Sequence, residues 1–132
     1  MESNTGATSV EQEIIRLEEQ ALRRWCSGDP YGFLEISAPD VVYFDPFLPQ
    51  RLDGIAALTA LYESLRGKIR AERVELINPQ VQVVGEAAVL TFNFVSWSDG
   101  IPMRWNCTEV YRRKEGRWEI IQTHWSFTKP RA

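Results

Sequence analysis

The first apolar residues of the chain recur every three or four positions, which is the spacing of one buried helix face. They are Val10, Ile14, Leu17, Ala21 and Trp25. Ser9 and Gln12 stand three residues apart at the start of this stretch, as in a capping box. The pattern predicts a first helix that ends near Gly28.

Two further helices and a short strand follow in the first half. Asp29 and Pro30 form an N-cap and a first-turn proline, which predicts a short helix that includes Ile36 and stops by Pro39. Residues 41–45 are a short strand candidate, followed by a turn at Asp45-Pro46. Asp53-Gly54 is placed to cap a third helix. Its apolar positions, ahead of Gly67, are Ile55, Leu58, Leu61, Tyr62 and Leu65.

The second half changes to runs rich in β-branched and aromatic residues, which is typical of strands. Turn residues separate these runs at Gly85, Asp99-Gly100 and Glu115-Gly116. The predicted strands are residues 70–84, 87–97, 103–113 and 117–128. Helices followed by four hairpin-linked antiparallel strands predict an α+β fold, with three N-terminal helices packed on one face of the sheet.

Apolar residues occur at both parities of the predicted strands. Leu90, Phe92 and Phe94 alternate with Val89, Val95 and Trp97. Because an exposed face of an antiparallel sheet usually carries polar residues, we expect a second copy of the chain to cover the outer face. The residues expected at this homodimer interface are Phe92, Phe94, Ile120 and His124.

Length and composition indicate one globular domain. The 132 residues, 44% hydrophobic and 25% charged, suit a single domain over 10–130 after a flexible start at 1–9. The net charge of −3, with the two signs interspersed, disfavours nucleic acid as a partner. The longest apolar runs fall short of a membrane span, which takes about 20 residues.

The cysteines and the polar start of the chain indicate the compartment. Cys26 and Cys107 are far apart and form no CxxC pair, and residues 1–9 do not resemble a signal peptide. Both cysteines are therefore expected as free thiols in a cytoplasmic protein.

Several segments resemble the association domain of calcium/calmodulin-dependent protein kinase II, in order and in spacing, over about residues 11–130. This domain belongs to the nuclear transport factor two-like (SnoaL-like) superfamily, so the resemblance implies a cystatin-like cone with a curved sheet. Because 132 residues leave no room for a kinase domain, we expect no kinase activity. The similar segments are Glu13-Ile14-Ile15, Ser27-Gly28-Asp29, Phe44-Asp45-Pro46, 77–86, Ser98-Asp99-Gly100 and 116–126.

The resemblance also implies a pocket between sheet and helices, lined by arginines in the kinase family. The matching positions here are Asn93, Glu109 and Trp125. An amide, a carboxylate and an indole replace guanidinium groups, which favours an uncharged or weakly basic, partly apolar ligand over an anion. The ligand-binding residues that we predict are Tyr43, Asn93, Trp97, Trp105, Trp125 and Trp25.

A more distant resemblance to the ketosteroid isomerases concerns Asp45-Pro46. In those enzymes an Asp-Pro pair at the matching point supplies a general base that moves a proton next to a carbonyl, although they also use a tyrosine that the first helix here lacks. Asp45 would be the base, and a buried, protonated Glu109 would donate a hydrogen bond to the enolate. Alternatively, Asp45 caps a turn, and Glu109 faces solvent or pairs with an arginine.

His124 is the only histidine, which excludes a multi-histidine metal site. We expect neither a metal nor a cofactor. His124 and Trp125 are adjacent in one strand and therefore face opposite sides of the sheet. His124 is expected at the dimer interface if Trp125 enters the pocket.

Three functions are compatible with these residues. The first is a dimeric domain that binds a small apolar molecule. The second is a cofactor-independent isomerase, cyclase or dehydratase that uses Asp45, and the third is an oligomerisation module. A fold that carries many functions does not decide among them.

Overall fold

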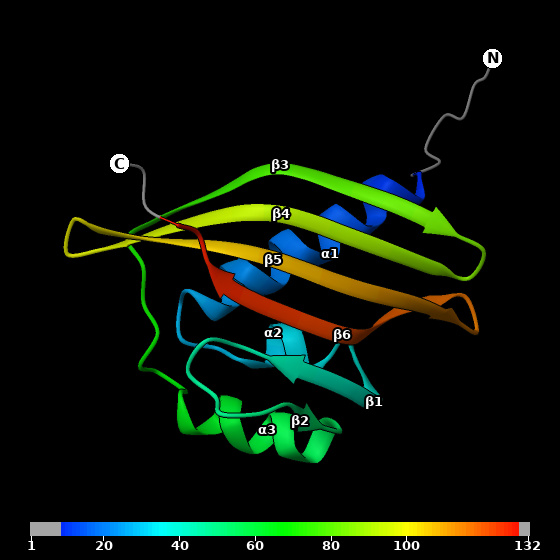
Figure 1. The fold of residues 1–132 in the computed structure, drawn as a ribbon, viewed down its shortest axis with the longest axis horizontal. Helices are drawn as coiled ribbons and strands as arrows, with labels where there is room; N and C mark the ends of the chain where they lie inside the picture. Colours follow the sequence, from blue (N-terminus) through cyan, green and yellow to red (C-terminus); the bar gives the residue numbers. More distant parts are fainter. Residues whose placement is uncertain (1–8, 130–132) are drawn as a thin grey trace.

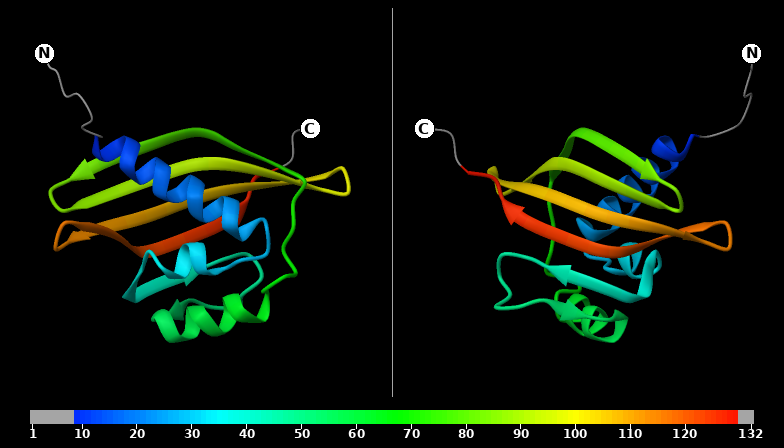
Figure 2. Two further views of the ribbon diagram at one scale, coloured as in Figure 1. Left: turned by 180° about the vertical axis from the view of Figure 1, so that it is seen from behind. Right: turned by 45° about the vertical axis from the view of Figure 1, so that its right-hand side comes forward.

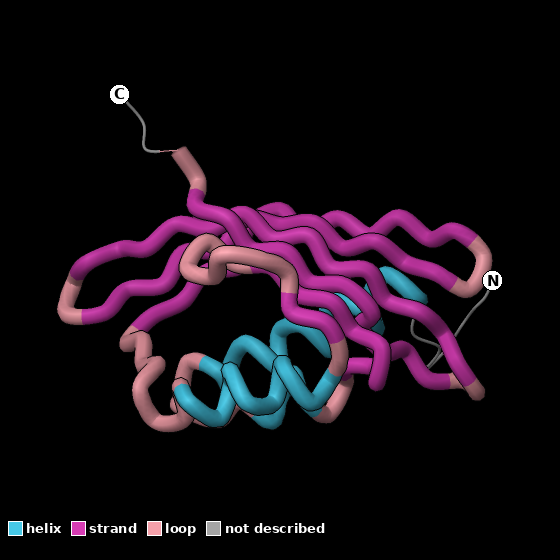
Figure 3. Tube along the Cα trace, turned by 60° about the horizontal axis from the view of Figure 1, so that its bottom comes forward, coloured by secondary structure: helices cyan, strands magenta, loops and turns pink. Residues whose placement is uncertain are grey.

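The computed structural model describes residues 9–129, which form three helices and one six-stranded sheet. The helices are α1 (Val10–Trp25), α2 (Tyr31–Leu34) and α3 (Ile55–Ser64). All three lie on the same side of the curved sheet (Figures 1 and 3). The predicted α+β class is therefore confirmed, whereas most of the segment expected to be flexible, residues 1–8, lies outside the described residues.

The sheet has the order β2-β1-β6-β5-β4-β3. The predicted meander forms its larger part, and β1 joins it by pairing in parallel with β6. All other neighbouring strands are antiparallel. The strands are β1 (Ser37–Phe44), β2 (Leu52–Asp53), β3 (Arg73–Val84), β4 (Ala87–Ser98), β5 (Ile101–Lys114) and β6 (Arg117–Phe127).

Helix α1 follows the sequence pattern closely. The predicted capping box is present: the Gln12 N–H donates to Ser9 Oγ at 3.1 Å, and the Ser9 N–H donates to Gln12 Oε1 at 3.2 Å. The buried face includes Ile14, Ala21 and Leu22, and the helix crosses the inner face of the sheet (Figure 2). Among the described residues, no helix is both long and apolar enough to cross a membrane.

The second helix is shorter than predicted, and the first strand is longer. Helix α2 ends at Leu34, and β1 begins at Ser37 and includes Pro39. A proline has no N–H for a sheet ladder, and Pro39 lies where the β1–β6 register is interrupted, between Ser37 and Val42. Strand β2 was not predicted, because two residues carry no readable alternation.

The two faces of the sheet differ from the prediction. Phe92, Phe94 and Ile120 are buried within the single chain, on the face that the helices cover. The structure therefore does not place them at an outer interface. The outer face carries a polar ladder instead, in which Asn93 Nδ2 donates to Asn106 Oδ1 at 2.7 Å and Asn106 Nδ2 to Ser126 Oγ at 3.1 Å.

His124 lies on this outer face, as predicted, and is exposed. Its ring lies 5.0 Å from the ring of Phe44, centroid to centroid. Glu109, by contrast, points inward and is completely buried.

Candidate functional site

A cavity of about 380 Å³ lies between the inner face of the sheet and the helices. Helices and strands from both halves of the chain contribute to its wall, together with the linker between α3 and β3. Most of the wall is apolar. Its large apolar side chains include Leu22, Trp25, Phe33, Phe94, Trp105 and Trp125.

The aromatic rings of the wall pack edge to face, which fixes their orientation. The centroids of Trp105 and Trp125 are 5.8 Å apart with an interplanar angle of 80°, and Phe94 packs against Trp125 at 6.0 Å. Trp25 contacts Tyr62 in a tilted arrangement, with the centroids 4.8 Å apart and an interplanar angle of 55°. The rings hold one another apart, so the cavity is a preformed property of the fold.

A small polar group from β1 and α3 interrupts this apolar wall. Tyr43 Oη donates to Asp45 Oδ2 at 2.9 Å, and the Phe47 N–H donates to Asp45 Oδ1 at 2.8 Å. The second bond closes a turn that Asp45 caps. Turn capping was the alternative to a catalytic role in the sequence analysis of Asp45. Asp45 also lines the cavity, together with Tyr43 and Tyr62.

The two tyrosines stay neutral in this site. Burial raises the pKa of both hydroxyls well above the usual value. The next cause for Tyr43 is the neighbouring Tyr62, and for Tyr62 it is the charge of Glu109. Both hydroxyls therefore keep their protons at neutral pH and act as hydrogen-bond donors.

Charged groups of both signs line the cavity. Lys68 and Arg70, from the linker, contribute positive charge, and Asp45 contributes a negative one. The prediction of an uncharged or weakly basic ligand rested on Asn93, Glu109 and Trp125, of which only Trp125 lines the cavity. The two linker residues carried no recognisable motif in the sequence.

Five of the residues predicted for the site do line the cavity: Tyr43, Asp45, Trp25, Trp105 and Trp125. Asn93 and Trp97 do not, since they lie on the outer face of β4. The Arg73 guanidinium covers the Trp97 ring at 3.9 Å. The sequence assignment gave β4 the wrong parity, and a shift of one residue exchanges the two faces of a strand. Phe94 and Ser96 line the cavity instead.

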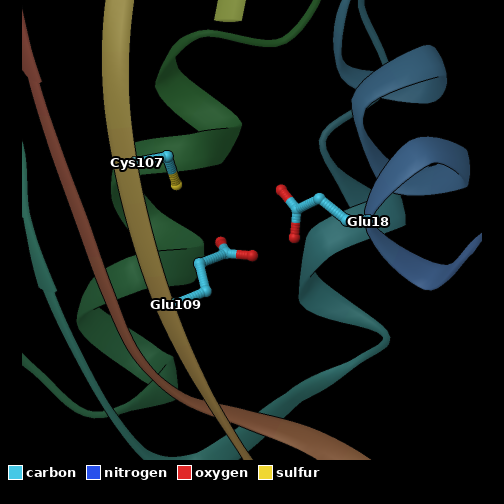
Figure 4. A group of neighbouring side chains, drawn as sticks. All are labelled: Glu18, Cys107 and Glu109. Atoms are coloured by element: carbon cyan, nitrogen blue, oxygen red, sulfur yellow. The ribbon is translucent and has the colours of Figure 1, made fainter. Parts of the chain in front are cut away.

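A second polar centre lies inside the core, where the side chains of Glu18 from α1 and Glu109 from β5 point toward each other (Figure 4). Both residues are 0% exposed. Tyr111 Oη donates to Glu18 Oε1 at 2.9 Å, and Thr123 Oγ1 donates to Glu109 Oε2 at 3.1 Å. The sequence contains a signal for Glu18, because it lies four residues from both Ile14 and Leu22, on the buried face of α1.

One proton held between the two carboxyl groups accounts for their closeness. Burial raises the pKa of Glu109 well above its usual range, and the charge of Glu18 and a hydrogen bond between the two groups raise it further. Burial also raises the pKa of Glu18, but hydrogen bonds from Glu109 and Tyr111 oppose this rise. Glu109 is therefore the protonated member of the pair, because two buried charges would repel each other.

Cys107 completes a group of three possible metal ligands, whose ligand atoms lie within 4.8 Å of one another. Burial raises the pKa of the Cys107 thiol well above its usual value, and the charges of both glutamates raise it further. A metal binds the thiolate rather than the thiol. Hydroxyl groups already donate to both carboxyl groups. The group therefore fits a shared proton better than a metal ion.

The family model described as the calcium/calmodulin dependent protein kinase II association domain matches residues 10–129. The chain belongs to this association-domain family. Among curated relatives, the kinase type II alpha chain of Drosophila melanogaster is 27% identical over 122 residues, which are 86% of this chain but 23% of that protein. The chain thus spans about a quarter of the length of these kinases.

Solved structures place the association-domain fold among the nuclear transport factor two-like proteins. A protein from Parabacteroides distasonis, provisionally named a ketosteroid isomerase, is 44% identical with a TM-score of 0.87, covering 98% of this chain and 96% of that one. A nuclear transport factor two-like protein from Pseudomonas putida is 27% identical with a TM-score of 0.80, covering 91% and 87%. The S. rosetta kinase II hub is 19% identical with a TM-score of 0.73, covering 92% and 99%, and supports the fold alone.

The shared proton predicts an unusual pH dependence of stability. Because the pKa of Glu109 is raised in the folded state, its contribution to the free energy of unfolding is fully present below the ordinary pKa of glutamate, about 4.3, and falls as the pH rises toward the folded pKa. Glu109→Gln keeps a neutral donor. Between about pH 5 and pH 8, we expect the free energy of unfolding to fall less for this variant than for the parent. The difference between the two falls should be about 1 kcal/mol or more.

Urea unfolding at several pH values measures this difference. Glu75→Gln is the matched control, because it makes the same change of side chain at a residue that is exposed on β3. Equal pH slopes for the parent and Glu109→Gln would show that Glu109 carries no shared proton.

Proposed function

We propose that the chain binds a small, largely apolar molecule in the cavity between sheet and helices. The observation that carries this proposal is a preformed cavity of about 380 Å³ with an aromatic wall. This volume lies in the range of about 300 to 1,000 Å³ that small-molecule sites occupy. Water gains few hydrogen bonds from such a wall, so an apolar ligand displaces it favourably.

The polar groups of the cavity would orient the ligand. The Tyr62 hydroxyl is a neutral donor in an apolar setting, suited to a carbonyl or hydroxyl oxygen of the ligand. The Tyr43 hydroxyl is already engaged with Asp45. A flat ring system with one oxygen substituent satisfies both the aromatic wall and this donor.

Binding can be tested with N-phenylnaphthylamine, an uncharged probe whose fluorescence rises in apolar sites. We expect saturable binding to the parent and at least tenfold weaker binding to Ser96→Trp, which places a large ring in the cavity. Asn93→Trp is the matched control, because it adds the same ring to the outer face of the same strand. Equal binding by the two variants would place the probe elsewhere.

A second candidate function is a cofactor-independent isomerase with Asp45 as general base. Two observations favour it: a carboxylate in an apolar cavity, and the 44% identical protein provisionally named a ketosteroid isomerase. Asp45 would remove a proton from the carbon next to a carbonyl, and the electron pair of that C–H bond would form an enolate. Tyr62 would donate to the enolate oxygen, and Asp45 would return the proton to another carbon.

Glu109 has no direct part in this reaction, because it lies outside the cavity lining. When the Glu109 carboxyl group loses its proton, its negative charge raises the pKa of the Tyr62 hydroxyl and keeps that hydroxyl protonated. Glu109 would thus act on the donor rather than on the ligand.

The enzyme candidate predicts that Asp45→Asn moves the double bond of an unsaturated cyclic ketone at least a hundredfold more slowly than the parent does. The appearance of the conjugated product can be followed by ultraviolet absorbance. N-phenylnaphthylamine binding serves as the control and should stay within about twofold of the parent. Parent protein without measurable isomerisation would leave binding alone as the function.

We also propose that the chain self-associates through the outer face of the sheet. Membership of the association-domain family supports this proposal. The outer face combines partly exposed apolar side chains, such as Val89 and Phe44, with the amide ladder of Asn93 and Asn106. A two-fold axis through this face would place the amide ladder of one copy of the chain against the same ladder of the second copy.

Sedimentation velocity tests this association at micromolar concentration. We expect a dimer or a larger species for the parent and a shift toward monomer for His124→Glu, because the new charges would face each other across the axis. Lys114→Glu, in the β5–β6 turn region, is the control and should leave the species unchanged. A parent that sediments as a monomer would contradict the proposal.

A further inference from the structure

The linker between α3 and β3 is held against the body of the protein at several points. The Gly67 N–H donates to Gly28 O at 3.0 Å, and the Ala71 N–H donates to Cys26 O at 3.1 Å. On the other side, Ser98 Oγ donates to Arg70 O at 2.6 Å. These bonds tie the linker to the end of α1 and to the end of β4, so its side chains have preset positions.

Gly28 allows this close approach. Its φ is +94°, and a Cβ atom there would lie 3.2 Å from Gly67 Cα and 3.7 Å from Arg70 Nη2. A larger residue would press on the backbone of Gly67 and push the linker away from the end of α1. The backbone therefore holds Arg70 close to the cavity wall.

Lys68 and Arg70 are the two cationic side chains that line the cavity, and both residues are exposed to solvent. Neither forms an ion pair with a carboxylate of residues 9–129. Other arginines of the chain do form such pairs. They are Arg24, Arg51, Arg66, Arg112 and Arg113. Within residues 9–129, therefore, two cations without a carboxylate partner stand on a fixed linker beside an apolar cavity.

Asp45 does not neutralise this pair. Each of its oxygens already accepts a hydrogen bond, from Tyr43 Oη and from the Phe47 N–H, within its own loop. The charged groups that line the cavity thus sum to one net positive charge. Because Lys68 and Arg70 face solvent, a charged ligand group could contact them without leaving water completely.

We infer that the ligand is an amphipathic monoanion whose apolar body fills the cavity and whose carboxylate or sulfonate-like group lies against Lys68 and Arg70. The inference rests on the proposed binding function and adds the charge of the ligand. It differs from the expectation of an uncharged or weakly basic ligand, because the linker cations were not recognised as part of the site. The guanidinium and the ammonium offer separate donors to one anionic group.

The matched probes for this inference are anilinonaphthalene sulfonate and N-phenylnaphthylamine, which share one aromatic framework and differ by the anionic group. We expect the sulfonate to bind about three- to tenfold more tightly at low salt, since exposed ion pairs contribute modestly. The preference should shrink at high salt, because salt screens exposed charges. The double variant Lys68→Gln and Arg70→Gln should abolish this preference, so that the ratio of the two probe affinities falls to about one.

The control is the double variant Lys114→Gln and Arg117→Gln, which removes the same charge. Both residues flank the β5–β6 turn, and the β4–β5 turn lies at the other end of β5. This control should keep the preference for the sulfonate. Equal affinities for the two probes, or a preference that survives in the Lys68 and Arg70 variant, would overturn the inference and leave the binding function standing. If neither probe binds, the binding function and the inference both fail.

Discussion

The cavity exists because a helix advances less than half as far per residue as a strand does. The 16 residues of α1 span about 24 Å at 1.5 Å per residue. The 14 residues of β5 span roughly 46 Å at 3.3 Å per residue. One helix of this length leaves part of the inner face uncovered. The large rings of Trp105 and Trp125 occupy that part, and α3 and its linker close the remaining side.

The position of α1 on the sheet depends on the second constraint, the buried carboxyl pair. Apolar packing alone permits small shifts of a helix along a sheet, whereas a hydrogen bond such as that from Tyr111 to Glu18 is satisfied in one position only. A displaced α1 would leave buried polar groups without partners, at a cost of about 1 to 3 kcal/mol for each group. The same helix supplies Leu22 and Trp25 to the cavity, so the pair also fixes one wall of the site.

The sequence was sufficient for the features that depend on local spacing. The face of α1, its capping box and the hairpin turns were all predicted, because each is set by residues within a few positions of one another. The parity of β4 was not, because Val95 and Phe94 are both apolar and neither strand face is marked by polar residues alone. A helix that covers one face decides this parity, and that helix is distant in the sequence.

Within the site, the residues that could be predicted lie on α1, β1, β5 and β6 or directly after β1, where an apolar or aromatic periodicity was readable. The linker residues could not be predicted, since Lys68 and Arg70 resemble any solvent-exposed pair until the backbone bonds of Gly67 and Ala71 are known. Glu18 was not predicted, although a charged residue in the middle of an apolar helix face indicates a buried polar partner.

The parallel pairing of β1 with β6 has a consequence for synthesis on the ribosome. Strand β1 pairs locally only with the two-residue β2, and its other sheet neighbour is β6, where Val42 is paired with Gln122. In the nascent chain, β1 therefore cannot pair with β6 until this last strand has emerged from the ribosome. Pairing between such distant segments is slow, because the entropy of closing a long loop is lost before the contacts form. During this interval the aromatic residues that later line the cavity are exposed, and chaperones have their best opportunity to bind.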